Sequence, residues 1–200
     1  MTRRTIYLYI ARTMDEIDEL LETLEQNEAV EKKFFEVEVS ILSILNFKDF
    51  FENLLSEIKE KFLIPYVWVS FIEDNDDAKM ILEFASSELL NQRLSLIDKN
   101  AFMTIVGSNT RPILVNTDLQ PYYKMLPQSE GYLIRSMAIA PITLDGDIIG
   151  SLNFGDTFDS RYFPGMDTSL LERLAVKVSI CLSNVMAHEK MKKRAERNSY

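Results

Sequence analysis

The chain has 200 residues, 46% hydrophobic and 26% charged, with a formal net charge of −9. This length is enough for one sizeable domain with an extension, or for at most two small domains, that fold without disulfide or metal. This acidic balance disfavours binding to nucleic-acid phosphates. A single cysteine excludes an intrachain disulfide, and no apolar run approaches the about 18 residues that span a bilayer, so we expect a cytoplasmic protein with no membrane partner.

The N-terminal part is predicted to be helical, because residues 13–62 contain neither Gly nor Pro. Heptad spacing relates Ile17, Leu21 and Leu24, and again a second set: Val30, Phe34, Val37, Ile41 and Ile44. Six residues separate the two sets, which indicates two helices or a skipped register rather than one continuous coil. We assign residues 1–45 to a helical dimerisation extension.

A domain is predicted to follow over residues 46–190. Residues 47–62 carry a broad apolar helical face, and Asn46 separates this helix from the preceding one. Residues 63–73 are β-branched and aromatic, and with residues 79–85 they are predicted to form a hairpin across a polar turn.

The middle of the domain alternates short elements. Residues 98–106 are predicted to form a helix with Asp98 as its N-cap and Gly107 just past its end. Pro112 places the strand candidate 111–117 at an edge. Residues 118–131 carry two prolines and are predicted to be a loop or a single helical turn.

Residues 132–156 carry the strongest local signal, a hairpin closed by Asp145-Gly146 in a two-residue turn. Both faces of this hairpin are largely apolar, so we expect it inside a sheet that is covered on both sides. The two-residue loop predicts these cross-strand pairs: Leu144 with Asp147, Ile142 with Ile149, Ala140 with Ser151, and Ala138 with Asn153.

A last helix is predicted from residue 166 to about residue 195, and residues 191–200 are predicted to be a flexible tail. This helix carries a second heptad seam of Leu171, Leu174, Val178, Cys181, Val185 and His188. The loop 156–165 joins the hairpin directly to the helix, so a change in the sheet would reach a helix that can pair with a partner. The two seams predict a homodimer.

Two stretches resemble a known family. "RSMAIAPITLDGDIIGSLNFGD", an aromatic-proline loop and "LLERLAVKVSICLSNVMAHEK" resemble the C-terminal half of a GAF domain: a proline-bearing strand, a Gly-centred turn, an "IG-x-L" strand and a helix. "GDTFDSRYFPGMDTSLL" is similar to the signature of a bacterial GAF-like family of unknown function, although Asp167 stands where that family more usually has Gly.

The resemblance covers about residues 45–188 and implies an α+β fold. The expected architecture is GAF-like (PAS-like): a central, mainly antiparallel sheet flanked by helices, with long N- and C-terminal helices. The resemblance further implies a regulatory domain that binds a small molecule or a protein, commonly as a dimer through the flanking helices.

Catalytic groups do not converge in the sequence. His188 is the only histidine, and Cys181 lies seven residues before it, about 10 Å away by helical rise and too far for a catalytic pair. One His and one Cys are too few ligands for a protein-only zinc or haem site. We therefore predict no enzymatic activity, no metal and no cofactor.

The resemblance implies a ligand over one sheet face, beneath residues 98–107 and 117–131. The guanidinium group of Arg135 can bind the carboxylate of an anionic ligand through two parallel hydrogen bonds. The alternative is an ion pair between Arg135 and Asp118. The small hairpin residues, Ala138 and Ala140 among them, either leave room for a ligand or admit a closely packed helix. The candidate ligand-binding residues are Arg135, Asp118, Tyr122, Tyr123, Ser136, Ser151 and Asn153.

Two functional hypotheses stay open at this point. The first is a dimeric, non-catalytic regulatory module that senses a small molecule or binds a protein, and that passes its signal to an unidentified downstream protein. The second is a ligandless GAF scaffold that acts only through dimerisation or partner binding.

Overall fold

The computed structural model describes residues 3–73, 75–85, 87–127 and 133–197. The chain divides into two compact units, Met1–Glu36 and Val37–Tyr200. The division falls inside helix α1 (Arg3–Ile41). Val37 and Ile41, in the last turns of α1, are fully buried in the second unit, and this burial places the end of α1 with the second unit.

Helix α1 is continuous, so the alternative of two helices is wrong, whereas a skipped register within one helix is compatible with the structure. The six residues after Leu24 contain no Gly or Pro, and nothing there interrupts the backbone hydrogen bonding. The phase of the apolar pattern shifts along one unbroken helix.

Helix α2 (Phe47–Phe62) is separated from α1 as predicted. The side chain of Asn46 caps α2 by accepting a hydrogen bond of 2.9 Å from the backbone N–H of Asp49. Leu63, in the left-handed region at φ 53°, ends the helix. The apolar face of α2 is fully buried and consists of Phe47, Phe50, Phe51, Leu54, Leu55 and Ile58.

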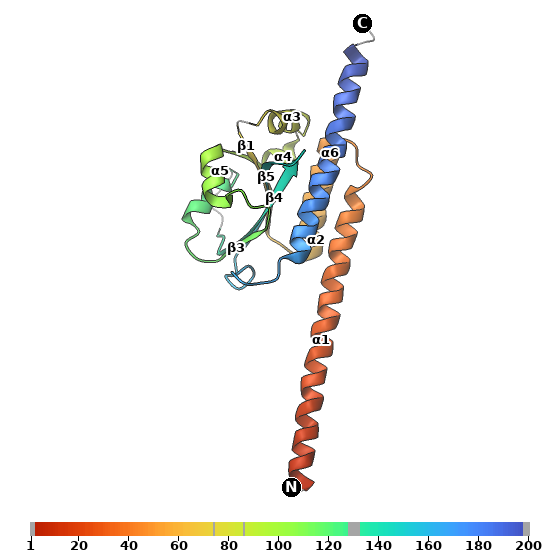
Figure 1. The fold of residues 1–200 in the computed structure, drawn as a ribbon, viewed down its shortest axis with the longest axis vertical. Helices are drawn as coiled ribbons and strands as arrows, with labels where there is room; N and C mark the ends of the chain where they lie inside the picture. Colours follow the sequence, from red (N-terminus) through yellow and green to blue (C-terminus); the bar gives the residue numbers. More distant parts are fainter. Residues whose placement is uncertain (1–2, 74, 86, 128–132, 198–200) are drawn as a thin grey trace. The chain divides into compact units, whose positions relative to one another are not determined.

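The second unit is built on one five-stranded sheet in the order β2-β1-β5-β4-β3. Its strands are β1 (Tyr66–Ile72), β2 (Leu94–Ile97), β3 (Ile113–Val115), β4 (Ser136–Leu144) and β5 (Asp147–Asp156). Only the β1–β2 pair is parallel. The predicted GAF-like α+β fold, with its mainly antiparallel sheet and flanking helices, is confirmed (Figure 1).

Residues 79–85 do not form the predicted second strand of a hairpin. They lie in helix α3 (Asp76–Phe84), whose N-cap Asn75 accepts a hydrogen bond from the backbone N–H of Ala78. Asn75 followed by Asp76 and Asp77 is a helix-start pattern, with acidic residues favoured near the helix N-terminus. The neighbours of β1 are instead β2, which follows the short helix α4 (Glu88–Asn91), and β5.

Three shorter elements match their predictions. Helix α5 (Lys99–Val106) is capped by Asp98 and followed by Gly107 at φ 69°. Strand β3 lies at the edge of the sheet. The predicted helical turn is the 3₁₀ helix η1 (Gln120–Met125), and residues 128–131 of that predicted loop lie outside the described residues.

The hairpin of β4 and β5 keeps the predicted Leu144–Asp147 pair, but the other predicted pairs are wrong by one residue. An irregularity between Ile142 and Thr143 shifts the register, so that Ile142 pairs with Gly150, Ala140 with Leu152 and Ala138 with Phe154. A one-residue shift moves side chains to the other face of a sheet.

The register shift separates the small residues that were predicted to share one face. Ser151 pairs with Pro141 and Asn153 with Ile139, and directly opposed residues lie on the same face. Ser136, Ala138 and Ala140 therefore lie on the opposite face from Ser151 and Asn153.

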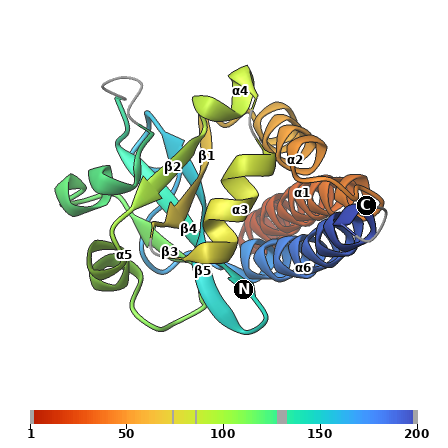
Figure 2. The same ribbon diagram turned by 90° about the horizontal axis from the view of Figure 1, so that it is seen from above.

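Helices cover both faces of the sheet, as predicted for its central hairpin (Figure 2). Helix α2 lies on the face that carries Phe71, whose ring meets that of Phe51 edge-on at 5.8 Å. Helix α6 (Ser169–Arg197) packs along β4, and its Ser179 hydroxyl accepts a hydrogen bond from the Thr143 backbone N–H. Helices α5 and η1 cover the other face.

The heptad seam of α6 is covered within the second unit. Leu174, Val178, Cys181 and Val185 are buried, while His188 is exposed. The small side chains of β4 lie on the face that α2 and α6 cover, which favours the closely packed helix over the ligand at these positions. The helix continues to Arg197, so residues 191–197 are helical.

Candidate functional site

A cluster of buried polar groups lies on the face of the sheet that carries Trp68. The backbone carbonyl of Met125 accepts three hydrogen bonds there, from Trp68 Nε1 at 2.7 Å, Ser70 Oγ at 2.8 Å and Ser95 Oγ at 2.8 Å. Met125 ends η1, so the strands β1 and β2 hold the end of this helix over their side of the sheet.

The polar cluster extends into β5. Asn153 Nδ2 donates to Ser70 Oγ at 2.9 Å, and Ser151 Oγ donates to Asn153 Oδ1 at 2.9 Å. All of these side chains are buried. Trp68, Ser70, Ser95, Met125, Ser151 and Asn153 are called the Met125 network below.

The Met125 network satisfies its own polar groups. Each side chain in it has a hydrogen-bond partner within the chain, as buried polar groups require. Chemically, the network is an acceptor held by three donors, and a ligand that used those donors would have to displace the Met125 carbonyl.

Of the predicted ligand residues, the structure brings Ser151, Asn153 and Tyr122 to this face. Tyr122 is half-buried and packs against the apolar clusters on both sides of the network. Ser136 lies on the opposite face, where its hydroxyl donates to the Phe158 carbonyl at 2.6 Å.

The remaining predicted residues, Arg135, Asp118 and Tyr123, are exposed. Arg135 and Asp118 are both described, and they form no ion pair with each other, so the alternative of an internal pair is wrong. Asp118 has φ 51°, a conformation typical of a turn. Whether any of the predicted residues binds a ligand stays a prediction.

Sequence reasoning missed Ser70, Ser95 and Met125. The alternation of β1 could have placed Ser70 on the same face as Trp68. Met125 contributes only its backbone, and a backbone acceptor leaves no signal in a side-chain pattern.

The loop between β5 and α6 is tied to three other elements. Asp156 Oδ1 accepts from the Phe158 N–H at 3.0 Å, Asn116 Nδ2 donates to the Asp159 carbonyl at 3.0 Å, and Arg161 Nη2 donates to the Phe62 carbonyl at 2.8 Å. These bonds link the loop to the end of α2 and to the segment after β3.

Tyr162, in the same loop, is unusual among the described residues. Its ring packs near Phe154, and its hydroxyl is buried without a hydrogen-bond partner. Burial raises the pKa of Tyr162 to about 12, and the positive charge of Arg161 opposes part of that rise. Tyr162 is therefore neutral at physiological pH.

Helix α6 is also joined to the last turn of α1. Arg173 Nε and Glu38 Oε1 form an ion pair at 2.8 Å, and the Glu38 carboxylate is buried. At the start of α6, Asp167 accepts hydrogen bonds from the backbone N–H and the hydroxyl of Ser169, which lower the pKa of Asp167. Position 167 thus serves the start of the helix.

Reactive groups are placed as follows. Cys181 is buried, and burial raises the pKa of its thiol, which disfavours the reactive thiolate. Within the described ranges, no three His, Cys, Asp or Glu residues lie close enough together to hold a metal ion. In the same ranges, the length and apolar character needed to cross a bilayer are not met by any helix.

A family model described as "Protein of unknown function, DUF484" matches residues 8–184. No curated protein matches the chain. Among solved structures, the chain is similar to a free methionine-R-sulfoxide reductase from Neisseria meningitidis in complex with its substrate, at 15% identity and a TM-score of 0.49, over 76% of this chain and 87% of that one.

The chain is also similar to the nlh2 GAF domain of A. aeolicus in an inactive state. The identity is 12% and the TM-score 0.45, over 84% of this chain and 98% of that one.

Proposed function

We propose that this chain, which belongs to the DUF484 family of proteins of unknown function, is a non-catalytic regulatory module that acts as a homodimer through its flanking helices. The GAF-like fold suggests a regulatory module that binds ligands or partner proteins. To this general role the proposal adds that the chain is dimeric, cytoplasmic and non-catalytic.

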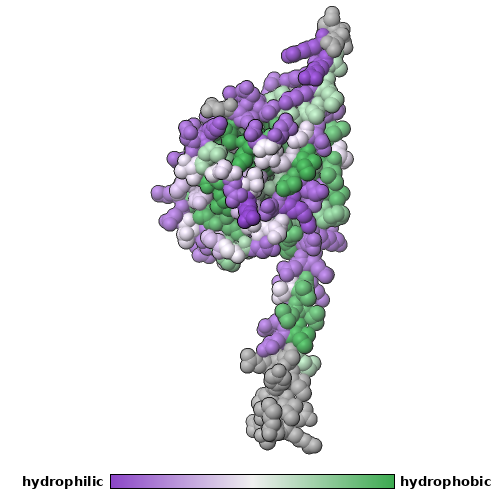
Figure 3. Space-filling model, viewed as in Figure 1, coloured by the Kyte–Doolittle hydropathy of each residue, from purple (hydrophilic) through white to green (hydrophobic). Residues whose placement is uncertain are grey.

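The observation that carries the proposal is an apolar stripe on α1 within the first unit. Ile17, Leu21 and Leu24 are 48%, 53% and 57% exposed, and their heptad spacing sets them on one side of the helix. Met14 and Leu20, at 60% and 64% exposed, extend this apolar surface. Figure 3 shows green side chains gathered along the described part of this segment.

A second copy of the chain is the partner that fits this stripe best. A heptad seam buries its apolar residues against another seam, and symmetric pairing supplies an identical one. Because about half of each such side chain is already covered, burial of the rest contributes about 1 kcal/mol per side chain. In the second unit, α6 carries a further exposed stripe of Val176, Ile180 and Met191, distinct from its buried seam.

The Met125 network helps to decide between a module that senses a small molecule and one that binds a protein. Its buried donors already bind the Met125 carbonyl, so a ligand over this face competes with a bond that the fold itself makes. This favours the interaction module, acting through the dimer and a downstream protein, over a sensor that uses the sheet face.

The absence of catalysis rests on the placement of the reactive groups. Cys181 is buried with a raised thiol pKa, and His188 is exposed. Neither is aligned with a base or an orienting group in the way that nucleophilic catalysis requires.

The dimer is tested by placing charge on the stripe. In the double variant Leu21→Glu/Leu24→Glu, two carboxylates would be buried at the seam, and charged groups are costly to bury without a partner. We expect the variant to sediment as a monomer at micromolar concentration, while wild type sediments as a dimer.

The matched control is Thr23→Glu/Gln26→Glu, which adds the same charge on the opposite side of the same turns. The control is expected to remain dimeric. Dimers in both variants, or monomers in both, would contradict an interface on this stripe.

A further inference from the structure

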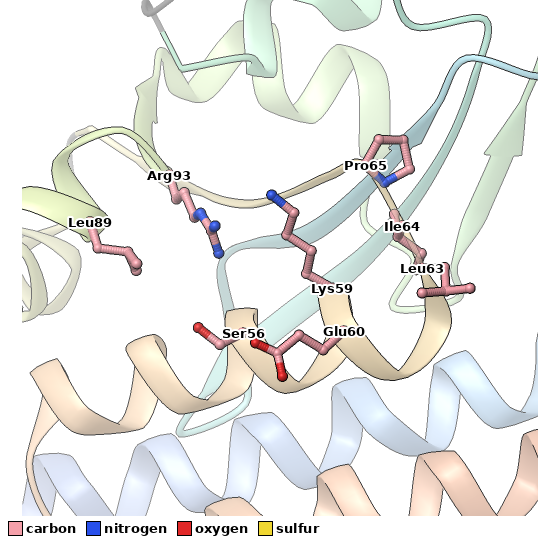
Figure 4. A pocket seen from close by; sticks show the side chains of 8 residues that line it. All are labelled: Ser56, Lys59, Glu60, Leu63, Ile64, Pro65, Leu89 and Arg93. Atoms are coloured by element: carbon pink, nitrogen blue, oxygen red, sulfur yellow. The ribbon is translucent and has the colours of Figure 1, made fainter.

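A hollow of about 560 Å³ lies between α2, α4 and the start of β1 (Figure 4). The hollow is open to solvent, since Leu63, which lines it, is 81% exposed. The hollow is separate from the Met125 network and from the exposed stripe of α1. The residues that line it are Ser56, Lys59, Glu60, Leu63, Ile64, Pro65, Leu89 and Arg93.

Arg93 is the main polar feature of the hollow. Its backbone is fixed on both sides, since its N–H donates to the Leu90 carbonyl and its carbonyl accepts from the Val69 N–H, each at 2.9 Å. Its Nη1 atom is buried and has no hydrogen-bond partner in the described chain. A buried donor left unpaired is costly and calls for an acceptor.

Lys59 brings a second positive charge to the same place. Figure 4 shows the ammonium group of Lys59 and the guanidinium of Arg93 extending toward each other across the hollow. Neither side chain forms an ion pair with the residues that the structure describes. Two like charges that converge repel each other, and an anion between them removes the repulsion.

The other walls indicate which anion fits. The hydroxyl of Ser56 offers a further hydrogen bond, and Glu60 also lines the hollow, with its carboxylate lying along α2 on the side of Ser56 (Figure 4). Because Glu60 offsets one of the two positive charges, the walls match a single negative charge better than the double charge of a phosphate. Leu63, Ile64, Pro65 and Leu89 supply an apolar surface.

We propose that this hollow binds a small organic carboxylate. The guanidinium of Arg93 binds the carboxylate through two parallel hydrogen bonds, the geometry that Arg favours. Lys59 and Ser56 hold the same group, and the apolar portion of the ligand packs against Leu89 and Pro65. This site does not depend on the dimer, so either proposal can fail without the other.

The test is a titration of the full-length ¹⁵N-labelled protein followed by NMR, with hexanoate and phenylacetate as probes. We expect saturable shifts of the Arg93 Nε–H signal and of backbone amides in α2 and α4. Arg93→Gln and Lys59→Gln should each weaken binding at least about tenfold, because each removes a charge-assisted hydrogen bond.

Two further variants make the test specific. Lys61→Gln removes a charge from the same helix outside the hollow, where Lys61 pairs with Glu57 at 3.2 Å, and it should leave binding unchanged. Glu60→Gln removes the opposing carboxylate, and it should strengthen binding of both probes.

Each of three results would overturn the proposal. These are the lack of saturable shifts with both carboxylates, binding by Arg93→Gln as tight as by wild type, and binding of inorganic phosphate or hexanol as tight as that of hexanoate. Because Lys59 is exposed, Lys59→Gln keeps the test valid if Arg93→Gln fails to fold.

Discussion

The hydroxyl of Tyr162 is buried without a hydrogen-bond partner, whereas the buried side chains of the Met125 network are all bonded. A phenol in this position loses its hydration on folding, and the neighbouring Arg161 guanidinium offsets only part of that loss. Because the neutral form is favoured in the fold, the pKa of Tyr162 is raised from 10.0 to about 12.

Tyr162→Phe is therefore expected to stabilise the protein by about 1 kcal/mol at pH 7, the cost of the unpaired hydroxyl. The pKa of Tyr162 is higher in the folded state, about 12, than in the unfolded state, 10.0. Ionisation of Tyr162 therefore does not affect wild-type stability below pH 10, and it lowers that stability as the pH rises from 10 to about 12, because the unfolded state ionises first. The variant should lose less stability than wild type across this interval.

Urea unfolding of both proteins at pH 7 and pH 11 measures the difference. Comparison with wild type cancels the titration of other groups, including Cys181. A loss of more than about 1 kcal/mol at pH 7 in the variant would mean that the hydroxyl has a partner.

Ser70 and Ser95 both donate to the Met125 carbonyl, but Ser70 also accepts from Asn153. Ser95→Ala should cost about 1 kcal/mol, since the carbonyl keeps two donors. Ser70→Ala should cost about 2 kcal/mol, because it also removes the closer of the two acceptors of the buried Asn153 amide, which keeps only the Ser151 carbonyl at 3.2 Å. Equal denaturation midpoints for the two variants would show that the network is not organised around Ser70.

Single residues were predicted unevenly from the sequence. The cap Asp98 was identified correctly, because capping side chains are polar residues at the start of an apolar helical pattern. Asn46 was predicted to separate two helices, but its capping role was not predicted. Ser151 and Asn153 were predicted as ligand-binding residues, and the structure places them in a hydrogen-bonded network centred on a backbone carbonyl, which the sequence did not predict. Arg93 was overlooked, because its isolation in a hollow follows from tertiary packing.

Among the elements, strands β1 and β5 lie so close together that one position of β5, Gly150, requires a glycine. A Cβ atom at Gly150 would overlap the backbone oxygen of Ser70, while one at Gly155 would lie 2.8 Å from the Cδ1 atom of Ile134. A backbone oxygen in a ladder cannot move without breaking pairing, but the end of a side chain can rotate. The close approach of β1 to β5 therefore explains why the "IG-x-L" stretch has a glycine, Gly150.

Gly150→Ala is expected to destabilise the protein by about 3 kcal/mol, at the upper end of the usual cost of overpacking, and Gly155→Ala by about 1 kcal/mol. Thermal or urea unfolding of the two variants measures the difference. Similar losses in both would contradict the close approach of β1 to β5 at Gly150.

Element types were mostly predictable from local pattern, and the errors have physical causes. Residues 79–85 contain an apolar run too short to separate strand from helix by periodicity, and the Asn75 cap decides for the helix. The register shift at Ile142 and Thr143 arises from packing inside the sheet. The turn residues Asp145-Gly146 predicted the end of the hairpin but not the pairing beyond it.

For the whole molecule, heptad spacing identified apolar seams without identifying what covers them. The α6 seam is covered within the second unit, and Val37 and Ile41 of the α1 seam are buried there too. Ile17, Leu21 and Leu24 remain exposed in the first unit. Heptad spacing indicates only that one face of a helix is buried. The structure is needed to tell whether that face packs within the same chain or against another chain.

Sedimentation equilibrium of the wild-type chain at micromolar concentration tests the proposed dimer most directly. We predict a mass of twice the 23.2 kDa of one chain, because the exposed stripe of α1 has no other partner in the first unit among its described residues. A mass of 23.2 kDa at all concentrations would contradict the proposal that this protein acts as a homodimer through its helices.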